Sequence, residues 1–266
     1  TSTGMAPGGA VKGMGDGARD LPPIVFVSRG PVPGEPGAIP GLGPHHHAAV
    51  TGGRLMVRER DGRMRELLRP DTFFDASDPA VSPAGSRIAF AGVTRPDSAW
   101  RIWVVGIDGG DLRQITFSYG EADGPPRIRQ AGAPDVFFPR FDDLDPCWID
   151  DSTLVFASTR FPQRAQYADV RVTNLFRTCV SRAPGRWCTP QRITAERNGA
   201  EEPAIDPTTG HLLFSRWWFN RHRAADSAPG LTTDPAAAIT RDTVNLWQTV
   251  EMSLSVLRPR LAAGDL

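Results

Sequence analysis

The 266-residue sequence predicts an all-β protein, a β-propeller of four-stranded antiparallel blades. Three segments, 75–95, 142–160 and 200–216, share acidic residues, a proline, a short apolar strand, a turn, a second apolar strand ending in Phe, and an arginine. Such a unit, repeated every 57 to 67 residues, is typical of propellers and solenoids. The 27 glycines and 25 prolines suit many short strands joined by turns. About four blades are visible, either alone or as part of a larger ring of six blades or more.

The first blade is expected at about residues 23–70. Residues 1–22 are small and Gly-rich, which is typical of a flexible leader. Ile24–Ser28 (IVFVS) has the apolar pattern of a buried strand. Arg54–Arg69 contains two strand patterns around Asp61-Gly62, a strong hairpin signal because such turns require positive φ.

The remaining blades are expected at about 75–117, 142–195 and 200–250. The second has the clearest pattern, with strands predicted at 80–82, 87–91, 101–107 and 112–116. The fourth is interrupted by residues 219–241 and resumes with NLWQTV at 245–250. Residues 251–266 are expected to be the start of a further connection or a truncated end.

Composition and the absence of known motifs argue against several classes of protein function. Thirty basic and thirty acidic residues leave no net charge, so the basic excess typical of nucleic-acid-binding proteins is missing. No apolar run approaches the roughly 18 residues that a membrane-spanning helix needs. The sequence has no G-x-S-x-G, Walker A or H-E-x-x-H motif. We therefore expect no catalytic residues and no cofactor in this chain.

The repeat, with closing strands LRQIT (112–116) and QRIT (191–194), resembles the TolB-type propeller repeat, also called the WD40-like or PD40 repeat. The stretch DLDPCWIDDSTLVFASTR is further similar to the propeller of hydrazine-synthase-alpha-like proteins. The resemblance covers about residues 24–250 and implies a scaffold fold rather than a particular function. Haem-bearing members of that family carry C-x-x-C-H motifs, and none occurs here.

Each repeat pairs an acidic residue before its proline with an arginine after its second strand. In a propeller blade these two positions lie at the same end, so their side chains are expected on one face. The arginines could form a ring that binds an anionic ligand or acidic partner. They could instead form structural Asp–Arg pairs, which repetition in every blade favours. The residues concerned are Asp78, Asp145, Glu202, Arg29, Arg95, Arg160 and Arg216.

Features that break the repeat are the other site candidates. His45, His46 and His47 lie in a Gly/Pro-rich loop and could contribute to a metal site, but no second cluster has metal-ligand spacing, which favours a solvated loop. Trp217 and Trp218 open the 219–241 insertion beside arginines. They could form a binding lip or pack beneath the insertion.

Two of the three cysteines are expected to face each other. Cys179 and Cys188 lie symmetrically about Ala183-Pro184, and a hairpin turning there would bring them within disulfide reach. A disulfide would imply an oxidising compartment; the alternative is two reduced thiols. Cys147 stands alone on a predicted inner strand and is expected to be a small core residue.

These observations favour a non-catalytic, extracytoplasmic propeller scaffold that binds a protein partner or a small ligand on its loop face. This is the face formed by the loops that enter the first strand and join the second and third strands of each blade. The alternative is the propeller portion of a larger, hydrazine-synthase-alpha-like enzyme whose catalytic domain lies outside this chain. A weaker third hypothesis is a metal-dependent enzyme that uses His45–His47.

Overall fold

The structure is a computed structural model. It describes residues 21–30, 50–118, 141–166, 171–180, 188–220, 223–224, 239–240 and 244–263. The expected leader, apart from its last two residues, and the histidines His45, His46 and His47 lie outside the described residues. The described part of the chain is built from antiparallel strands, and none of its segments is a helix able to cross a membrane.

The first blade has three strands within the described residues. They are β1 (Ile24–Ser28), β2 (Arg54–Arg58) and β3 (Met64–Glu66), in that order across the sheet. The predicted β2–β3 hairpin is present, and Gly62 has the positive φ of 86° that its turn requires. Asp61 does not share this conformation, so the turn differs from the expected one with two positive-φ residues.

The second and third blades each have four strands, paired in chain order. Blade two contains β4 (Asp75–Val81), β5 (Arg87–Val93), β6 (Arg101–Gly106) and β7 (Arg113–Gln114). Blade three contains β8 (Asp143–Asp150), β9 (Thr153–Ser158), β10 (Asn174–Cys179) and β11 (Gln191–Arg192). In blade two the first strand is longer and the outermost strand shorter than the sequence predicted.

The fourth blade also has four strands, which corrects the expectation for residues 251–266. Its strands are β12 (Ala200–Ile205), β13 (Leu212–Asn220), β16 (Val244–Met252) and β17 (Pro259–Ala263). β17 pairs with β16, and Arg260 forms an ion pair with Glu251 across the two strands at 2.9 Å. A separate two-stranded pair, β14 (Arg223–Ala224) and β15 (Ile239–Thr240), lies between β13 and β16 in the chain.

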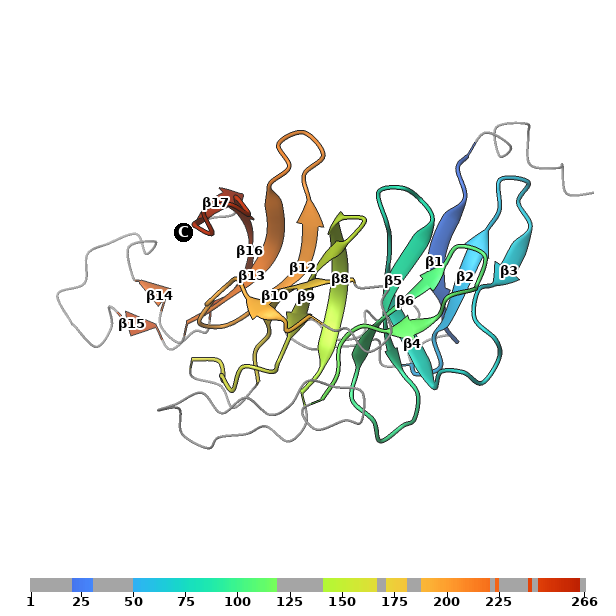
Figure 1. The fold of residues 1–266 in the computed structure, drawn as a ribbon. Coiled ribbons are helices and arrows are strands. Elements are labelled where there is room, and N and C mark those ends of the chain that lie inside the picture. Colours follow the sequence, from blue (N-terminus) through green and yellow to red (C-terminus); the bar gives the residue numbers. More distant parts are fainter. Residues whose placement is uncertain are drawn as a thin grey trace, which may run out of the picture.

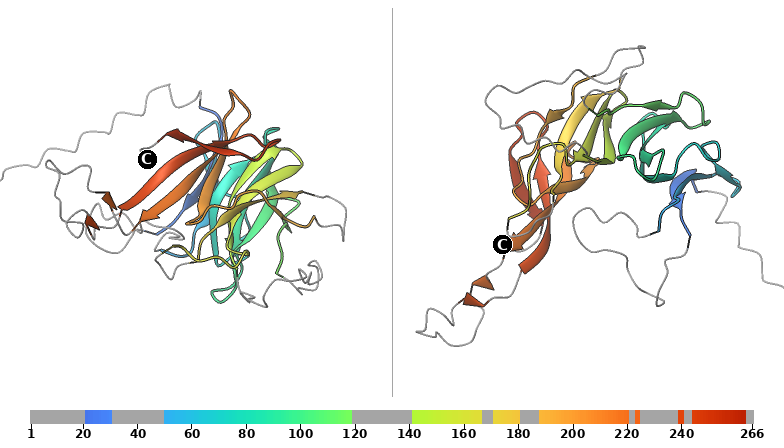
Figure 2. Two further views of the ribbon diagram at one scale, coloured as in Figure 1. Left: turned by 90° about the vertical axis from the view of Figure 1, so that its left-hand side faces the viewer. Right: turned by 90° about the horizontal axis from the view of Figure 1, so that it is seen from below.

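The four blades follow one another along an arc (Figures 1 and 2). Their first strands β4, β8 and β12 lie next to each other, and we call these the inner strands. The Phe of each repeat is part of the core that holds the blades together: Phe90 and Phe156 have no exposed surface and Phe214 is 2% exposed. The predicted all-β, propeller-like fold is therefore confirmed.

Each inner strand carries a β-bulge at its acidic-residue–proline step. The register with the next strand shifts at this step in all three blades. Because proline lacks an N–H, it cannot donate a ladder hydrogen bond, and a bulge accommodates it. The acidic residue before the proline has positive φ in each case: 53° at Asp78, 48° at Asp145 and 51° at Glu202.

Candidate functional site: the loop face and the inner strands

Arg160 lies buried at the end of β9 and pairs with Asp143 at the start of β8. Its Nη2 is 2.8 Å from both carboxylate oxygens, and the two side chains are 6% and 0% exposed. The Ser158 hydroxyl joins them, donating to Asp143 and accepting from Nε of Arg160. The rings of Phe141, Phe156 and Phe176 surround the guanidinium at 4.9 to 5.2 Å. This environment is that of a structural ion pair.

Arg29 connects blade one to blade two. Its Nη1 is 2.6 Å from Oδ1 of Asp75, and its Nη2 donates to the carbonyl of Ala76 at 2.9 Å. The same carboxylate accepts from the backbone N–H of Gly53 at 2.9 Å. A Cβ at Gly53 would lie 2.7 Å from that carboxylate and 2.8 Å from Cζ of Arg29, so only glycine fits this close approach.

The other two arginines of the repeat differ from each other. Arg216 is held by the side chain of Gln248, at 3.0 and 2.6 Å, and has Glu196 at 3.8 Å. Arg95 lies on an exposed loop with Asp97 as its partner, and both side chains are more than 70% exposed. Of the four predicted arginines, Arg95 is thus the one whose side chain is largely open to solvent.

The carboxylates that pair with the arginines are not those that the sequence suggested. We expected Asp78 and Asp145 to face the arginines, but Asp75 and Asp143, a few residues earlier on the same strands, form the pairs. The bulge explains the difference, because a positive φ redirects the chain between the start of each inner strand and the acidic residue before proline.

Four further carboxylates lie at or beside the bulges of the inner strands, and we call them the carboxylate row: Asp78 on β4, Asp145 on β8, and Glu201 and Glu202 on β12. Burial and the nearby negative charge of Asp78 raise the pKa of Asp145 well above its usual range. The backbone N–H of Glu202 donates to Asp145 Oδ2 at 3.2 Å and opposes this shift. Burial, followed by the charge of Glu202, raises the pKa of Glu201 to about 8.

Hydrogen bonds satisfy only some of the oxygen atoms in the carboxylate row. The Ser77 hydroxyl donates to Asp78 Oδ1 at 2.8 Å, while Asp78 Oδ2 is buried without a hydrogen-bond partner. The Ser215 hydroxyl donates to Glu202 at 3.0 Å. No ion pair in the described part of the chain involves any of the four carboxylates.

The two predicted tryptophans have different environments. Trp217 is 5% exposed and packs against Ala165 and Val172 of blade three, so it is anchored there. Trp218 is 44% exposed, and its ring lies 5.7 Å from Cζ of Arg216. Trp247, which the sequence analysis did not single out, stacks on Trp217 at 6.3 Å and is 37% exposed.

These tryptophans lie on an extended hairpin. β13 and β16 each have nine residues, and their pairing continues past Arg216 to Asn220 and Val244. β5 and β9, the equivalent strands of blades two and three, have seven and six residues. The cross-strand register places Trp247 opposite Trp217, a neighbour that a repeat-based reading of the sequence could not identify.

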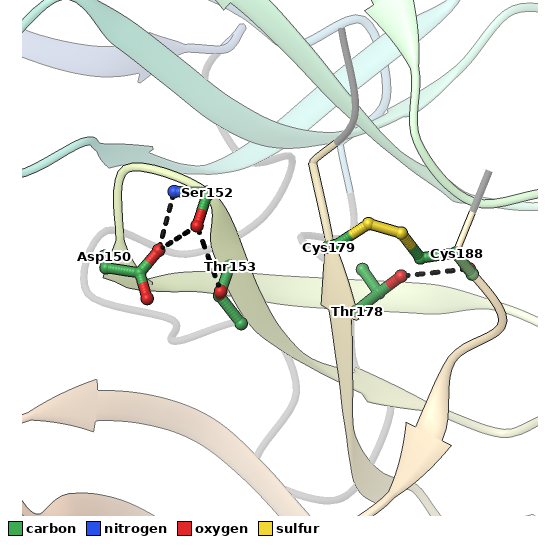
Figure 3. Close-up of a disulfide and its surroundings, with 6 residues drawn as sticks. All are labelled: Asp150, Ser152, Thr153, Thr178, Cys179 and Cys188. Atoms are coloured by element: carbon green, nitrogen blue, oxygen red, sulfur yellow. Dashed lines mark hydrogen bonds between the residues drawn. A yellow bond between two sulfur atoms is a disulfide. The ribbon is translucent and has the colours of Figure 1, made fainter. Parts of the chain in front are cut away.

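A disulfide links Cys179, the last residue of β10, to Cys188, which precedes β11 (Figure 3). Beside it, the Thr178 hydroxyl donates to the carbonyl of Cys188 at 3.1 Å. The bond therefore closes the end of blade three opposite the loop face. Cys147 is a free, half-buried thiol, and burial raises its pKa to about 11.

No group of three or more His, Cys, Asp or Glu side chains among the described residues has an arrangement suited to a metal ion. The carboxylate row therefore lacks the converging geometry of such a site. The histidines of the 30–53 loop lie outside the described part and remain a prediction.

No family model and no curated protein matches the chain. Among solved structures, it is similar to Kuenenia stuttgartiensis hydrazine synthase, with a TM-score of 0.58 and 16% identity over 91% of this chain and 31% of that one. TolB from Agrobacterium tumefaciens gives a TM-score of 0.46 and 13% identity, covering 80% of this chain and 59% of that one. TolB from Acinetobacter baumannii gives 0.45 and 9%, covering 80% and 39%.

The chain thus spans about a third of the hydrazine synthase chain that it matches. At these identities the similarity concerns the fold alone. The similarity to hydrazine synthase confirms the propeller fold that the repeat predicted.

Proposed function

We propose that this chain is a non-catalytic propeller scaffold that binds a protein partner on its loop face, with Trp218 as the central contact residue. The observation that carries the proposal is the exposure of this large aromatic side chain, 44%, on an extended hairpin whose other face carries the stacked pair Trp217 and Trp247. Tryptophan is enriched among the residues that dominate protein–protein binding energy, because it buries a large area at little entropic cost.

The hairpin is suited to this role because its base is fixed. Trp217 is buried against blade three, so the adjacent Trp218, on the opposite face of the hairpin, is presented on a rigid support. Rigid presentation lowers the entropic cost of binding. A small ligand is the alternative occupant, but ligand sites are usually concave, whereas Trp218 lies on a hairpin that is longer than its counterparts. Arg95 adds an exposed cation to the same face.

An extracytoplasmic location is part of the proposal. The Cys179–Cys188 disulfide supports it, because disulfides form and persist in oxidising compartments and are rare in the cytosol.

The second candidate is the propeller portion of a larger enzyme. The similarity to hydrazine synthase favours it, since this chain matches only 31% of that larger chain. Measuring the mass of the intact polypeptide in its source cells separates the candidates. A polypeptide several times larger than 28.9 kDa favours the enzyme, and one of this size favours the scaffold.

The partner proposal is tested with a photo-crosslinking amino acid placed at Trp218 and, as a matched control, at Met64. Both side chains are apolar and exposed, but Met64 lies on β3, at the far end of the arc. We expect a discrete crosslinked protein from position 218 in the source cells and not from position 64. The same products at both positions, or none at 218, would refute the proposal.

A further inference from the structure

The described part of blade one contains the second, third and fourth strands of a blade, but not the first. The equivalence rests on a backbone hydrogen bond that recurs at each junction between blades, from the first strand of one blade to the residue before the third strand of the preceding blade. The donor–acceptor pairs are Ala76–Gly53, Asp143–Trp100 and Ala200–Thr173, at 3.0 to 3.1 Å. Gly53 precedes β2, so β2 corresponds to the third strands β6 and β10. β1, which pairs with β2, therefore corresponds to the second strands β5 and β9.

The strand that blade one lacks leaves one edge of β1 open. In blades two and three, the inner strands β4 and β8 pair along this edge of the second strand. β1, at one end of the arc and blue in Figure 1, pairs with β2 alone within the described residues. No other backbone hydrogen bond in the described part of the chain involves residues 24–28. Half of the backbone groups of such an edge strand point away from its neighbour, so they can pair with an added strand.

The exposure of two side chains follows from this open edge. Val25 and Val27 face blade two and pack against its core, yet both remain partly exposed. Their equivalents in blade three, Val155 and Ala157, have no exposed surface. Because blade two covers this face of β1, the difference arises from the position beside β1, where blade three has its inner strand.

The last residue of β1 offers a polar group to an acidic side chain. Ser28 is equivalent to Ser158, because each lies opposite the first residue of the third strand. In blade three, Asp143 of the inner strand lies directly opposite Ser158 and accepts its hydroxyl hydrogen at 2.6 Å. The Ser28 hydroxyl has no hydrogen-bond partner among the described residues. An acidic residue opposite Ser28 would supply that partner.

A second contact suits the acidic residue before a proline. The backbone N–H of Glu202 in blade four donates to Asp145 Oδ2 in blade three at 3.2 Å. The carboxylate before the proline of one inner strand can thus accept the N–H at the same position of the next inner strand. For a strand beside β1, that N–H belongs to Asp78 of β4. All three described inner strands carry this acidic residue–proline step.

We propose that the open edge of β1 binds an extended segment of a partner protein, which pairs antiparallel with β1 and completes blade one as its inner strand. The segment carries an acidic residue opposite Ser28 and, two residues later, an acidic residue followed by proline. Strand addition at a sheet edge is a recurring mode of peptide recognition, in which main-chain hydrogen bonds supply affinity and side-chain contacts supply specificity. This site is separate from the surface at Trp218, which lies on blade four.

A partner protein fits the site better than a second copy of this chain. The three described inner strands are each paired with the second strand of their own blade. A second copy could therefore offer one of them only by disrupting its own blade.

The test uses the full chain and a synthetic peptide with the sequence of residues 141–151, in which Cys147→Ser removes the thiol. Calorimetry measures binding, and hydrogen–deuterium exchange locates it. We expect the peptide to bind and to slow amide exchange in residues 24–28, while a peptide with the same residues in scrambled order does neither. Ser28→Ala in the protein should weaken binding about tenfold, because a hydrogen bond to a charged group is lost. Ser255→Ala, on blade four, is the matched control and should bind as wild type does.

A peptide variant keeps the test independent of whether Ser28→Ala folds. Asp143→Asn within the peptide should also weaken binding about tenfold. Absence of binding at millimolar peptide, or equal affinity of the Asp143→Asn peptide, would overturn the proposal. So would amides in β1 that exchange as slowly as those of β5 in the free chain: in a monomer, another segment of this chain already covers the edge, and in a dimer detected by sedimentation, a second copy does.

Discussion

Replacing Arg160 with alanine should destabilise the protein more than replacing any exposed arginine. The change leaves Asp143, whose side chain is 0% exposed, with only the Ser158 hydroxyl, which donates to it at 2.6 Å. Breaking a buried ion pair by removing one partner costs about 3–5 kcal/mol, because the other charge stays buried. Three aromatic rings also lose their contact with the guanidinium. We therefore expect a loss of about 3–5 kcal/mol in the free energy of unfolding.

The assay is urea denaturation followed by tryptophan fluorescence and circular dichroism, together with thermal melting. For a chain of this size, about 1 kcal/mol corresponds to roughly 2–4 °C, so Tm should fall by roughly 6–20 °C. Arg95→Ala is the matched control: its side chain is 73% exposed, and the change should stay within about 0.5 kcal/mol.

A double-mutant cycle separates the ion pair from the loss of packing. Asp143→Asn and Arg160→Met each remove one charge, and the double variant removes both. If the buried charge is the cause, the double variant should be more stable than the sum of the single losses predicts. An Arg160→Ala loss no larger than that of Arg95→Ala would refute the structural assignment and restore Arg160 as a candidate ligand-binding residue.

Three further changes test the packing, the disulfide and the tryptophans. Gly53→Ala should cost about 1–3 kcal/mol in urea unfolding, because a methyl group overlaps the carbonyl of β4; an unchanged midpoint would contradict the close approach. Replacing Cys179 and Cys188 by serine should cost about 2–4 kcal/mol, and dithiothreitol should lower the wild-type Tm but not that of the variant. Trp217→Ala should cost about 3–5 kcal/mol and Trp218→Ala less than about 1 kcal/mol in the same assay. Equal losses would mean that the exposed ring is also structural.

The repeat in the sequence predicted the fold because its apolar positions are those that pack between blades. Phe90, Phe156 and Phe214 occur at the same place in each unit and are buried in the core. β17 was missed because an edge strand needs little apolar surface: in PRLAA only Leu261 is half-buried, and the flanking residues are polar or small. Its place is set by pairing with β16, which no local pattern reveals.

The candidate site was less predictable because it depends on backbone conformation. An acidic residue before proline is normally extended, so the motif does not predict the positive φ at Asp78, Asp145 and Glu202. The bulge shifts the arginine partners to earlier residues. The stacking of Trp217 and Trp247 likewise depends on the cross-strand register between β13 and β16, which sequence spacing does not fix because an insertion separates the two strands.

The two sets of charges in the repeat act on the fold in opposite ways. Asp75 with Arg29 and Asp143 with Arg160 bring opposite charges together, and such contacts stabilise the fold at any pH at which both groups are ionised. The carboxylate row brings like charges together at positions that also carry an unfavourable φ. The ion pairs therefore stabilise the starts of the inner strands, whereas the bulges place carboxylates that have no ion-pair partner among the described residues.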